Sequence, residues 1–287
     1  MHFVDAKSLL TRQNGMNLYR GCAHGCIYCD SRSKCYQFTH PFEDIEVKQN
    51  ATVLLEDILK RRRRRIVIST GSMSDPYQPC ERELQLTRRC LELLERYGFG
   101  ASVITKSDLV LRDLELFERI HRKAKGVLQM TLTVADDGLS RVLEPNVCTT
   151  TRRYEVLKEF QRAGVPTVVW LTPILPFLTD TEENVRRILD DCFDAGVKGI
   201  VCFGMGLTLR EGNREYFYAA LDRHFPGLSD EYRRRYGNAY EAASPNTAAL
   251  MRLFHEACEK HGVLHDPNEC FRFIAELPEQ TEQLSLF

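Results

Sequence analysis

Three cysteines stand close together near the start of the sequence, in the run Cys22-Ala-His-Gly-Cys26-Ile-Tyr-Cys29. Structural zinc normally needs four ligands, often as two cysteine pairs, and no second CxxC pair occurs in this sequence. His24 or Cys35 would have to supply the fourth ligand. Three thiolates in one tight loop instead suit a [4Fe–4S] cluster whose fourth iron stays open to a substrate or cofactor. The spacing therefore favours an iron–sulfur cluster over structural zinc.

The other eight cysteines are spread singly through segments that are expected to be helical or stranded. A total of eleven is odd, and the first fifteen residues lack the apolar core of a signal peptide. Both observations argue against a disulfide framework and favour a cytoplasmic protein. Most of these cysteines are expected to be small buried hydrophobes.

The composition is that of a folded globular protein. The chain has 287 residues, of which 43% are hydrophobic and 28% charged, and this excludes disorder over most of its length. The net charge of −1 provides no overall basic field, so any contact with nucleic acid must come from a local patch. The most apolar stretch, 163–178, contains three prolines and is not expected to span a membrane.

Strands and helices are expected to alternate from residue 16 to residue 203. The expected strands are 16–20, 66–70, 101–105, 127–134, 166–171 and 199–203. The expected helices between them are 51–62, 84–97, 109–122, 153–163 and 182–195. Such repeated strand–helix units predict an α/β fold with a parallel sheet, either open or curled toward a barrel. Functional residues are then expected where the strands end.

This alternation stops near residue 205. Helices are expected at 213–223, 229–235 and 244–261, followed by a short tail. We therefore predict three parts: a barrel over 1–205, a helical C-terminal cap over 206–276 and a flexible tail over 277–287.

The cysteine motif resembles the signature of the radical S-adenosylmethionine (SAM) superfamily, in which an aromatic residue, here Tyr28, precedes the last cysteine. Further motifs resemble the branch related to spore photoproduct lyase and occur in that branch's order within residues 17–203. They are NLYRGC (17–22), SDPYQP (74–79), VITK (103–106), LEP (143–145), the Arg152-Arg153 pair and TPILP (172–176).

The resemblance implies a partial (β/α)6 TIM-like barrel and two cofactors. Cys22, Cys26 and Cys29 would hold three irons of a [4Fe–4S] cluster, and the amine and carboxylate of SAM would chelate the fourth. Reductive cleavage of SAM would yield a 5′-deoxyadenosyl radical that abstracts a hydrogen atom from the substrate. The electron would come from a donor such as flavodoxin or ferredoxin.

The resemblance also suggests which residues bind the methionine part of SAM. Ser72, Ser74 and Asp75 follow the second expected strand, 66–70, where the methionine ammonium would lie. Ordinary turn chemistry also explains the two serines. Lys106 ends the next strand and would pair with the methionine carboxylate, the alternative being a solvated lysine.

Other residues are assigned to the nucleoside part of SAM and to the substrate radical. Thr131 and Thr133 would contact the ribose, although β-propensity alone also explains threonines there. Tyr28 would lie by the adenine. The lyase uses a cysteine outside the cluster as a hydrogen-atom donor. Cys35 and Cys80 are the candidates here, with a structural role as the alternative, and neither aligns with that donor.

Two features point toward nucleic acid. Arginine runs occur at 61–65 and 233–235, and each also suits a solvated helix C-terminus. The last residues, Gln283, Leu284, Leu286 and Phe287, resemble the short peptide by which bacterial repair proteins dock on the DNA sliding clamp. The alternative is a tail that packs back on the barrel. The sequence thus predicts a radical SAM enzyme acting on nucleic acid, in DNA repair or modification. Alternatives are an RNA, protein or small-molecule substrate, or a non-catalytic iron–sulfur or zinc protein.

Overall fold

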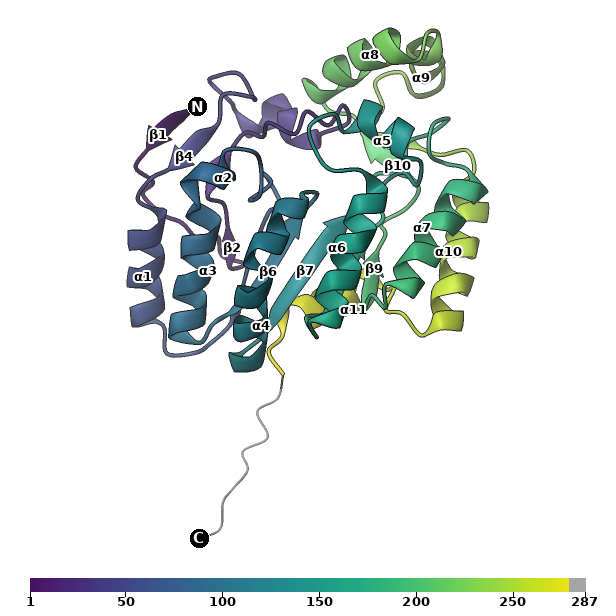
Figure 1. Ribbon diagram of the computed structural model, residues 1–287. Helices are drawn as coiled ribbons and strands as arrows, with labels where there is room; N and C mark the ends of the chain where they lie inside the picture. Colours follow the sequence, from purple (N-terminus) through teal and green to yellow (C-terminus); the bar gives the residue numbers. More distant parts are fainter. Residues whose placement is uncertain (279–287) are drawn as a thin grey trace.

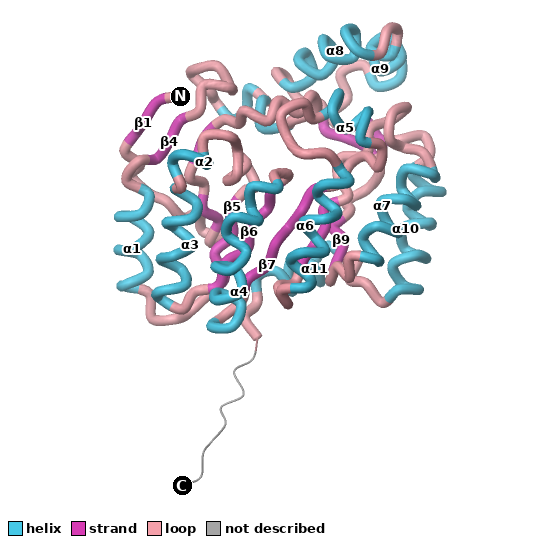
Figure 2. Tube along the Cα trace, viewed as in Figure 1, coloured by secondary structure: helices cyan, strands magenta, loops and turns pink. Residues whose placement is uncertain are grey.

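The computed structural model describes residues 1–278, so the predicted clamp-docking residues 283–287 lie outside the described part of the chain. Its centre is a six-stranded sheet in which neighbouring strands are parallel and follow one another in sequence order (Figures 1 and 2). The strands are β2 (Gly15–Met16), β5 (Val67–Thr70), β6 (Gly100–Thr105), β7 (Gly126–Thr131), β8 (Thr167–Trp170) and β9 (Gly199–Val201). The predicted α/β fold is confirmed.

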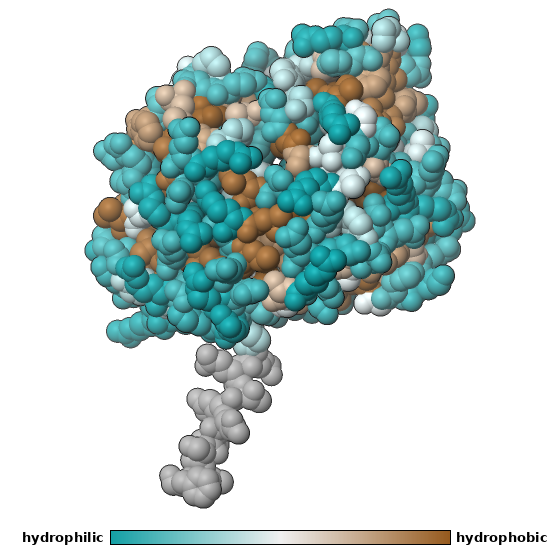
Figure 3. Space-filling model, in the orientation of Figure 1, coloured by the Kyte–Doolittle hydropathy of each residue, from teal (hydrophilic) through white to brown (hydrophobic). Residues whose placement is uncertain are grey.

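Amphipathic helices cover the outer face of this sheet (Figure 1). They are α1 (Ala51–Arg61), α3 (Leu86–Tyr97), α4 (Leu114–Lys123), α6 (Thr150–Arg162), α7 (Glu182–Asp194) and α10 (Thr247–His261). Their apolar residues, such as Leu55, Leu91 and Phe160, are buried in one large core with the outward residues of the strands. This burial supplies the main stabilisation of the fold. The face drawn in Figure 3 is correspondingly mostly hydrophilic over these helices.

The first predicted strand, 16–20, is wrong as a single element. Met16 pairs with Thr70 in the central sheet, whereas β3 (Tyr19–Arg20) pairs with β4 (Glu46–Lys48) in a second sheet that also contains β1 (His2–Val4). The chain leaves the central sheet after Met16 because β3 forms its antiparallel hydrogen bonds with β4. This change of partner carries the chain to the cysteine run, which begins two residues after Arg20.

The predicted helix 84–97 is confirmed as α3, which begins two residues later, and a short helix that the prediction lacks, α2 (Glu81–Leu84), precedes it. Gln85 between them has a left-handed backbone, with φ of 48°. The buried carboxylate of Glu81 accepts hydrogen bonds from the amides of Thr87 (3.0 Å) and Arg88 (3.4 Å). These amides belong to the first turn of α3, where no backbone acceptor exists for them, so the carboxylate starts a new helix.

The segment after residue 205 occupies three different places. The antiparallel strands β10 (Gly206–Thr208) and β11 (Glu241–Ala243), with α8 (Asn213–His224) and α9 (Leu228–Tyr236), share a core with Tyr28 and Leu143. Figure 1 shows α8 and α9 at the end of the molecule where the strands of the central sheet point. Helix α10 instead joins the outer layer beside α7.

Helix α11 (Pro267–Ala275) is absent from the sequence prediction and lies on the inner face of the sheet. Its Cys270 and Ile274 pack against Val127, Val168 and Val201. The next residues along the same strands belong to the core under the outer helices. Because side chains alternate between the two faces of a strand, α11 fills the inner face.

Among the described residues, no helix combines the length and apolarity that a membrane crossing requires.

Candidate functional site

The three clustered cysteines lie in the loop that follows β3, and all three are free thiols. Cys22 and Cys26 are buried and Cys29 is half-buried. The preceding Gly21 has φ of 85°, and a Cβ there would lie 2.4 Å from the carbonyl oxygen of Phe42. Only glycine fits this position, which lets the chain turn into the loop against the segment around Phe42. That segment also accepts a hydrogen bond from the Cys22 amide, at 3.2 Å.

Residues after β5 hold the first half of the cysteine loop. Ser74 Oγ donates a hydrogen bond to the carbonyl of Gly21 at 2.6 Å. The side chain of Gln78 accepts one from the Ala23 amide at 3.1 Å and donates one to Ser74 Oγ at 3.2 Å. The predicted SAM residue Ser74 is therefore used in positioning the loop, whereas Ser72 is exposed.

The last residue of α5 (Asp137–Leu143) and the residues after it also hold the cysteine loop. The Ile27 amide donates to the carbonyl of Leu143 at 2.9 Å. Asn146 donates from its side chain to the carbonyl of Ala23 at 2.9 Å and from its amide to that of His24 at 3.1 Å. Hydrogen bonds from the residues that follow β5 and from the end of α5 thus hold the loop.

A buried ion pair lies inside the loop, between His24 Nδ1 and Asp75 Oδ2 at 3.4 Å. Asp75 also accepts hydrogen bonds from the Thr105 hydroxyl (2.7 Å) and from the Lys106 amide (2.8 Å), so it joins the loop to β6. Burial disfavours the charge of both residues, but the attraction between the two opposite charges outweighs this effect. The pKa of His24 rises to about 10, and that of Asp75 falls to about 2. Burial opposes ionisation of Cys22 as well, yet its hydrogen bond with His24 lowers the thiol pKa.

Lys106 follows β6 and places a cation beside the loop. Its Nζ lies 5.7 Å from the centre of the Tyr28 ring. Burial opposes its charge, but the neighbouring Cys26 thiol and Glu144 carboxylate outweigh burial and raise its pKa. Within residues 1–278, no carboxylate lies within 4.0 Å of this ammonium. The charge is therefore free to meet a small anion.

A second buried network backs Tyr28. Its hydroxyl donates to Glu144 and lies 3.3 Å from the Thr133 hydroxyl. Glu144 forms an ion pair with Arg153 in which both side chains are fully buried. Arg153 also donates to the carbonyl of Thr131 at 3.2 Å, at the end of β7. The sequence offered Glu144 and Arg153 only as parts of motifs; nothing in it showed that they pair.

The two predicted donor cysteines lie apart from this network. Cys35 is exposed, 3.3 Å from Nη1 of Arg210. Cys80 precedes α2, and burial with the nearby Glu81 raises its pKa to about 11. Sequence reasoning missed Cys148, whose Sγ donates to the carbonyl of Lys106 at 3.1 Å. No spacing marks Cys148, because it reaches Lys106 only through the fold.

An aromatic group lies on the inner face of the sheet, next to where β8 and β9 end. Trp170 ends β8, Phe203 follows β9, and Phe271 is on α11. Their ring centres are 5.8 to 6.0 Å apart. Phe203 is 62% exposed and Phe271 is 37% exposed, so the group offers ring surface to a ligand. Trp170 is fixed because its indole donates to Gln129 at 2.7 Å.

The donor set fits a cluster with one open iron. Three free thiols share one loop, while His24 is engaged by Asp75 and Cys35 contacts Arg210. The loop therefore offers three sulfur ligands, which suits a cubane with one iron left to a small molecule better than a closed four-ligand zinc site.

Comparison with known proteins identifies the family of this chain. The model of the Radical SAM superfamily matches residues 16–192. An uncharacterized protein of Mycobacterium tuberculosis is 33% identical over 227 residues, covering 77% of this chain and 66% of that protein. One of Methanocaldococcus jannaschii is 32% identical over 169 residues, covering 58% and 62%. The matches thus span slightly less than two thirds of the relatives' own lengths.

Among solved structures, a cysteine-to-serine variant of spore photoproduct lyase superposes with a TM-score of 0.64 at 14% identity, covering 92% of this chain and 80% of that chain. A double variant of the same enzyme, with bound AdoMet and dinucleoside spore photoproduct, gives 0.62 at 14% identity, covering 87% and 74%. At these identities the likeness is one of fold.

Proposed function

Because this chain belongs to the radical SAM superfamily, we propose that Cys22, Cys26 and Cys29 are the ligands of its [4Fe–4S] cluster. Cluster and SAM together supply the reductive cleavage of SAM that starts radical chemistry. The observation that carries the proposal is the loop of three free thiols, which hydrogen bonds from the β5 and α5 sides hold beside the Lys106 ammonium. Residues 1–278 place no carboxylate within 4.0 Å of that ammonium. The protein's own part is to hold these thiols, bind SAM and exclude water.

Lys106 is proposed to bind the methionine carboxylate of SAM. Its ammonium stands beside the cysteine loop without a carboxylate partner in the described chain, and its pKa is raised, so it keeps its charge. Thr131 and Thr133, both buried at the end of β7, are proposed to face the ribose, and Tyr28 the adenine.

Asp75 and Ser74 are proposed to act mainly as positioning residues. Their oxygens already serve His24, Thr105 and the backbone of the loop, which leaves little capacity for the methionine ammonium. Binding of the ammonium by Asp75, Ser74 or the exposed Ser72 stays a prediction. The same holds for Cys35 and Cys80 as hydrogen-atom donors.

For the substrate, we propose a nucleic acid whose base stacks on the aromatic group of Trp170, Phe203 and Phe271. Exposed rings at the ends of parallel strands suit a planar base, and stacking is the usual way in which proteins hold unpaired bases. The solved structure of spore photoproduct lyase with a dinucleoside gives this fold a nucleotide-bearing precedent. DNA repair or modification, with lyase-like chemistry, follows as the first candidate activity.

An arginine beside the cysteine loop supports the same substrate. Arg210 stacks on Tyr240, with 5.1 Å between its guanidinium carbon and the ring centre, and Tyr240 is 49% exposed. Such pairs hold single-stranded nucleic acid by charge and stacking together. The partners that we propose are an electron donor such as flavodoxin or ferredoxin and the DNA sliding clamp, in the cytoplasm.

The test is SAM cleavage by anaerobically reconstituted protein reduced with dithionite. We expect 5′-deoxyadenosine and methionine from the wild type and none from the Cys22→Ala/Cys26→Ala/Cys29→Ala variant, which should also lose its bound iron. Iron retention together with cleavage in that variant would refute the ligand assignment.

A second set of reactions tests the substrate. Single-stranded DNA, duplex DNA, RNA and peptides are added in turn, and stimulation by DNA alone is expected. Phe203→Ala should weaken oligonucleotide binding by about 1–3 kcal/mol, the range for one stacked base. Phe3→Ala removes a ring of similar exposure from β1 and should leave binding unchanged. Stimulation by RNA or peptide alone would transfer the substrate assignment to the corresponding alternative.

A further inference from the structure

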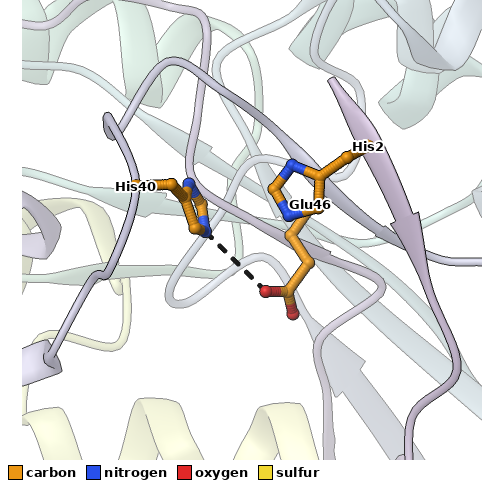
Figure 4. A group of neighbouring side chains, drawn as sticks. All are labelled: His2, His40 and Glu46. Carbon is orange, nitrogen blue, oxygen red and sulfur yellow. Dashed lines mark ion pairs between the residues drawn. The ribbon is translucent and has the colours of Figure 1, made fainter.

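A second group of metal-binding side chains lies outside the cysteine loop, on the small sheet formed by β1, β4 and β3. His2 is on β1 and is the register partner of Glu46 on β4. His40 belongs to the segment that runs from the cysteine loop to β4. One ligand atom from each of these three residues lies within 4.8 Å of the others. Figure 4 shows the three side chains, which point toward one another.

Both histidines are oriented as metal-bound histidines usually are. His2 Nδ1 lies 3.0 Å from Asp44 Oδ2, and His40 Nδ1 lies 3.0 Å from the carbonyl oxygen of Pro41. Carboxylate and carbonyl oxygens only accept hydrogen bonds, so both Nδ1 atoms must donate. The neutral rings then keep a lone pair on Nε2. Such an oxygen acceptor behind each ring is the common outer shell of a zinc site.

One atom of the group lacks the hydrogen-bond partner that its burial calls for. His40 Nε2 is buried without a hydrogen-bond partner, at 3.7 Å from Glu46 Oε2 (dashed in Figure 4). No lysine or arginine of residues 1–278 lies within 4.0 Å of the Glu46 carboxylate. A buried polar atom without a partner is costly, and a cation between these atoms would satisfy both of them.

We propose that His2, His40 and Glu46 bind one divalent metal ion of zinc type. Two imidazole nitrogens and one carboxylate form a ligand set that zinc accepts, with water as the fourth ligand. The His2 side chain is 39% exposed, which leaves room for that water. Asp44 is a positioning residue behind His2.

The ion would fasten the N-terminal strand to the support of the cysteine loop. The segment between His40 and Glu46 contains Phe42, whose carbonyl oxygen accepts the hydrogen bond of the Cys22 amide. The same oxygen lies so near Gly21 that a side chain there would collide with it. A metal bridge from β1 to both ends of this segment would restrict its motion. The proposed site is therefore structural, and it is separate from the cluster.

Zinc binding is measured on the 287-residue protein, without a polyhistidine tag or other added residues ahead of Met1. A background with serine at positions 22, 26 and 29 prevents zinc from binding the cluster thiols. One equivalent of Zn²⁺ is expected by calorimetry and by metal analysis after desalting. Co²⁺ in the same background should give a spectrum without thiolate-to-metal charge transfer. Less than half an equivalent would overturn the proposal.

Single substitutions in this background identify the ligands. His2→Gln, His40→Gln and Glu46→Gln should each abolish the stoichiometric binding, and Asp44→Asn should weaken it about 10- to 100-fold. His255→Gln, an exposed histidine on α10, is the matched control and should bind as the parent does. Circular dichroism confirms that each variant is folded. The His2 side chain is partly exposed, so His2→Gln is expected to fold and to report on metal binding alone. Binding that survives His2→Gln would show adventitious metal and refute the site.

Discussion

Three carboxylates near the cysteine loop carry charges that the protein interior normally excludes. Asp75, Glu81 and Glu144 are each buried or nearly so, and each accepts hydrogen bonds from several segments. A buried charge is tolerated only when such partners replace water. Asp75 and Glu144 thereby hold His24 and Tyr28 of the cysteine loop, whereas Glu81 holds the start of α3. Substituting them tests these contacts one residue at a time.

Lys106 gives the most direct test of SAM binding. Lys106→Ala should weaken SAM binding by about 1–3 kcal/mol, because a charge-assisted hydrogen bond to the methionine carboxylate is lost. Calorimetric titration of reconstituted protein measures this, and the iron–sulfur absorption spectrum should not change. Unaltered affinity would mean that the ammonium does not meet SAM.

Glu144→Gln should destabilise the fold by about 3–5 kcal/mol, because it leaves the charge of Arg153 buried without the opposite charge of its ion pair. Denaturant unfolding of the cluster-free protein measures the loss. The neighbouring Arg152→Gln is the control, since Arg152 makes only exposed ion pairs and should cost less than about 1 kcal/mol. Equal costs for the two variants would contradict the role of the buried pair.

The lowered pKa of the Glu144 carboxyl makes the stability of the fold depend on pH. Burial works against the charge of Glu144, but Arg153 and Lys106 outweigh burial and hold its pKa below the usual 4.5. The folded state therefore binds this proton less readily than the unfolded state. The resulting stability is present above pH 4.5 and is lost as the pH falls through the lower folded value. Unfolding curves across this range should show a smaller acid loss in Glu144→Gln than in wild type.

At the scale of elements, apolar packing and two hydrogen bonds from one lysine hold α11 on the inner face of the sheet. Its apolar side packs on Val127, Val168 and Val201, and Lys125 donates to the carbonyls of Phe273 and Glu276 at its C-terminal end. A cation there satisfies carbonyls that lack helical partners and matches the helix dipole. This helix also carries Phe271, so its docking determines whether the aromatic group forms.

Lys125→Met should loosen α11 by about 1–2 kcal/mol, since the cationic cap is lost while the aliphatic packing is kept. Hydrogen exchange should accelerate at the amides of α11 and remain unchanged in α4. Lys123→Met is the matched control, because Lys123 is half-exposed and pairs only with Glu95 across the surface. Equal exchange in wild type and Lys125→Met would show that packing alone holds the helix.

At the scale of the whole molecule, the two ends of the central sheet differ in role. The cysteine loop stands where the strands end, while Pro278 lines a cavity of about 510 Å³ with Lys125 and Pro166 where they begin. The described part of the chain therefore ends, at Pro278, at the opposite end of the sheet from the cysteine loop.

Deleting residues 283–287 should abolish binding to the sliding clamp and leave substrate-free SAM cleavage unchanged. Burying two leucines and a phenylalanine, at about 1.5–3 kcal/mol each less the ordering cost, supports micromolar affinity. A pull-down and a calorimetric titration with purified clamp measure it. Absence of binding by the full-length chain at tens of micromolar would remove this partner.

The sequence by itself determined the features that depend on local pattern. The spacing of Cys22, Cys26 and Cys29 indicates three ligands on one loop, and hydrophobic periodicity with glycine stops locates most of the strands and outer helices. These signals can be read from one segment at a time, because a tight loop and an amphipathic helix are each built from neighbouring residues.

Only the tertiary structure decided which distant residues meet. Tyr28 reaches Thr133 and Glu144, and His2 reaches His40, through pairings that no spacing records. The chain leaves the central sheet after Met16 because β4 offers a partner, and α11 turns inward because the inner valines are left uncovered. Burial and the partnering of charges are properties of the assembled interior. They become defined only when segments far apart in the chain exclude water from one another.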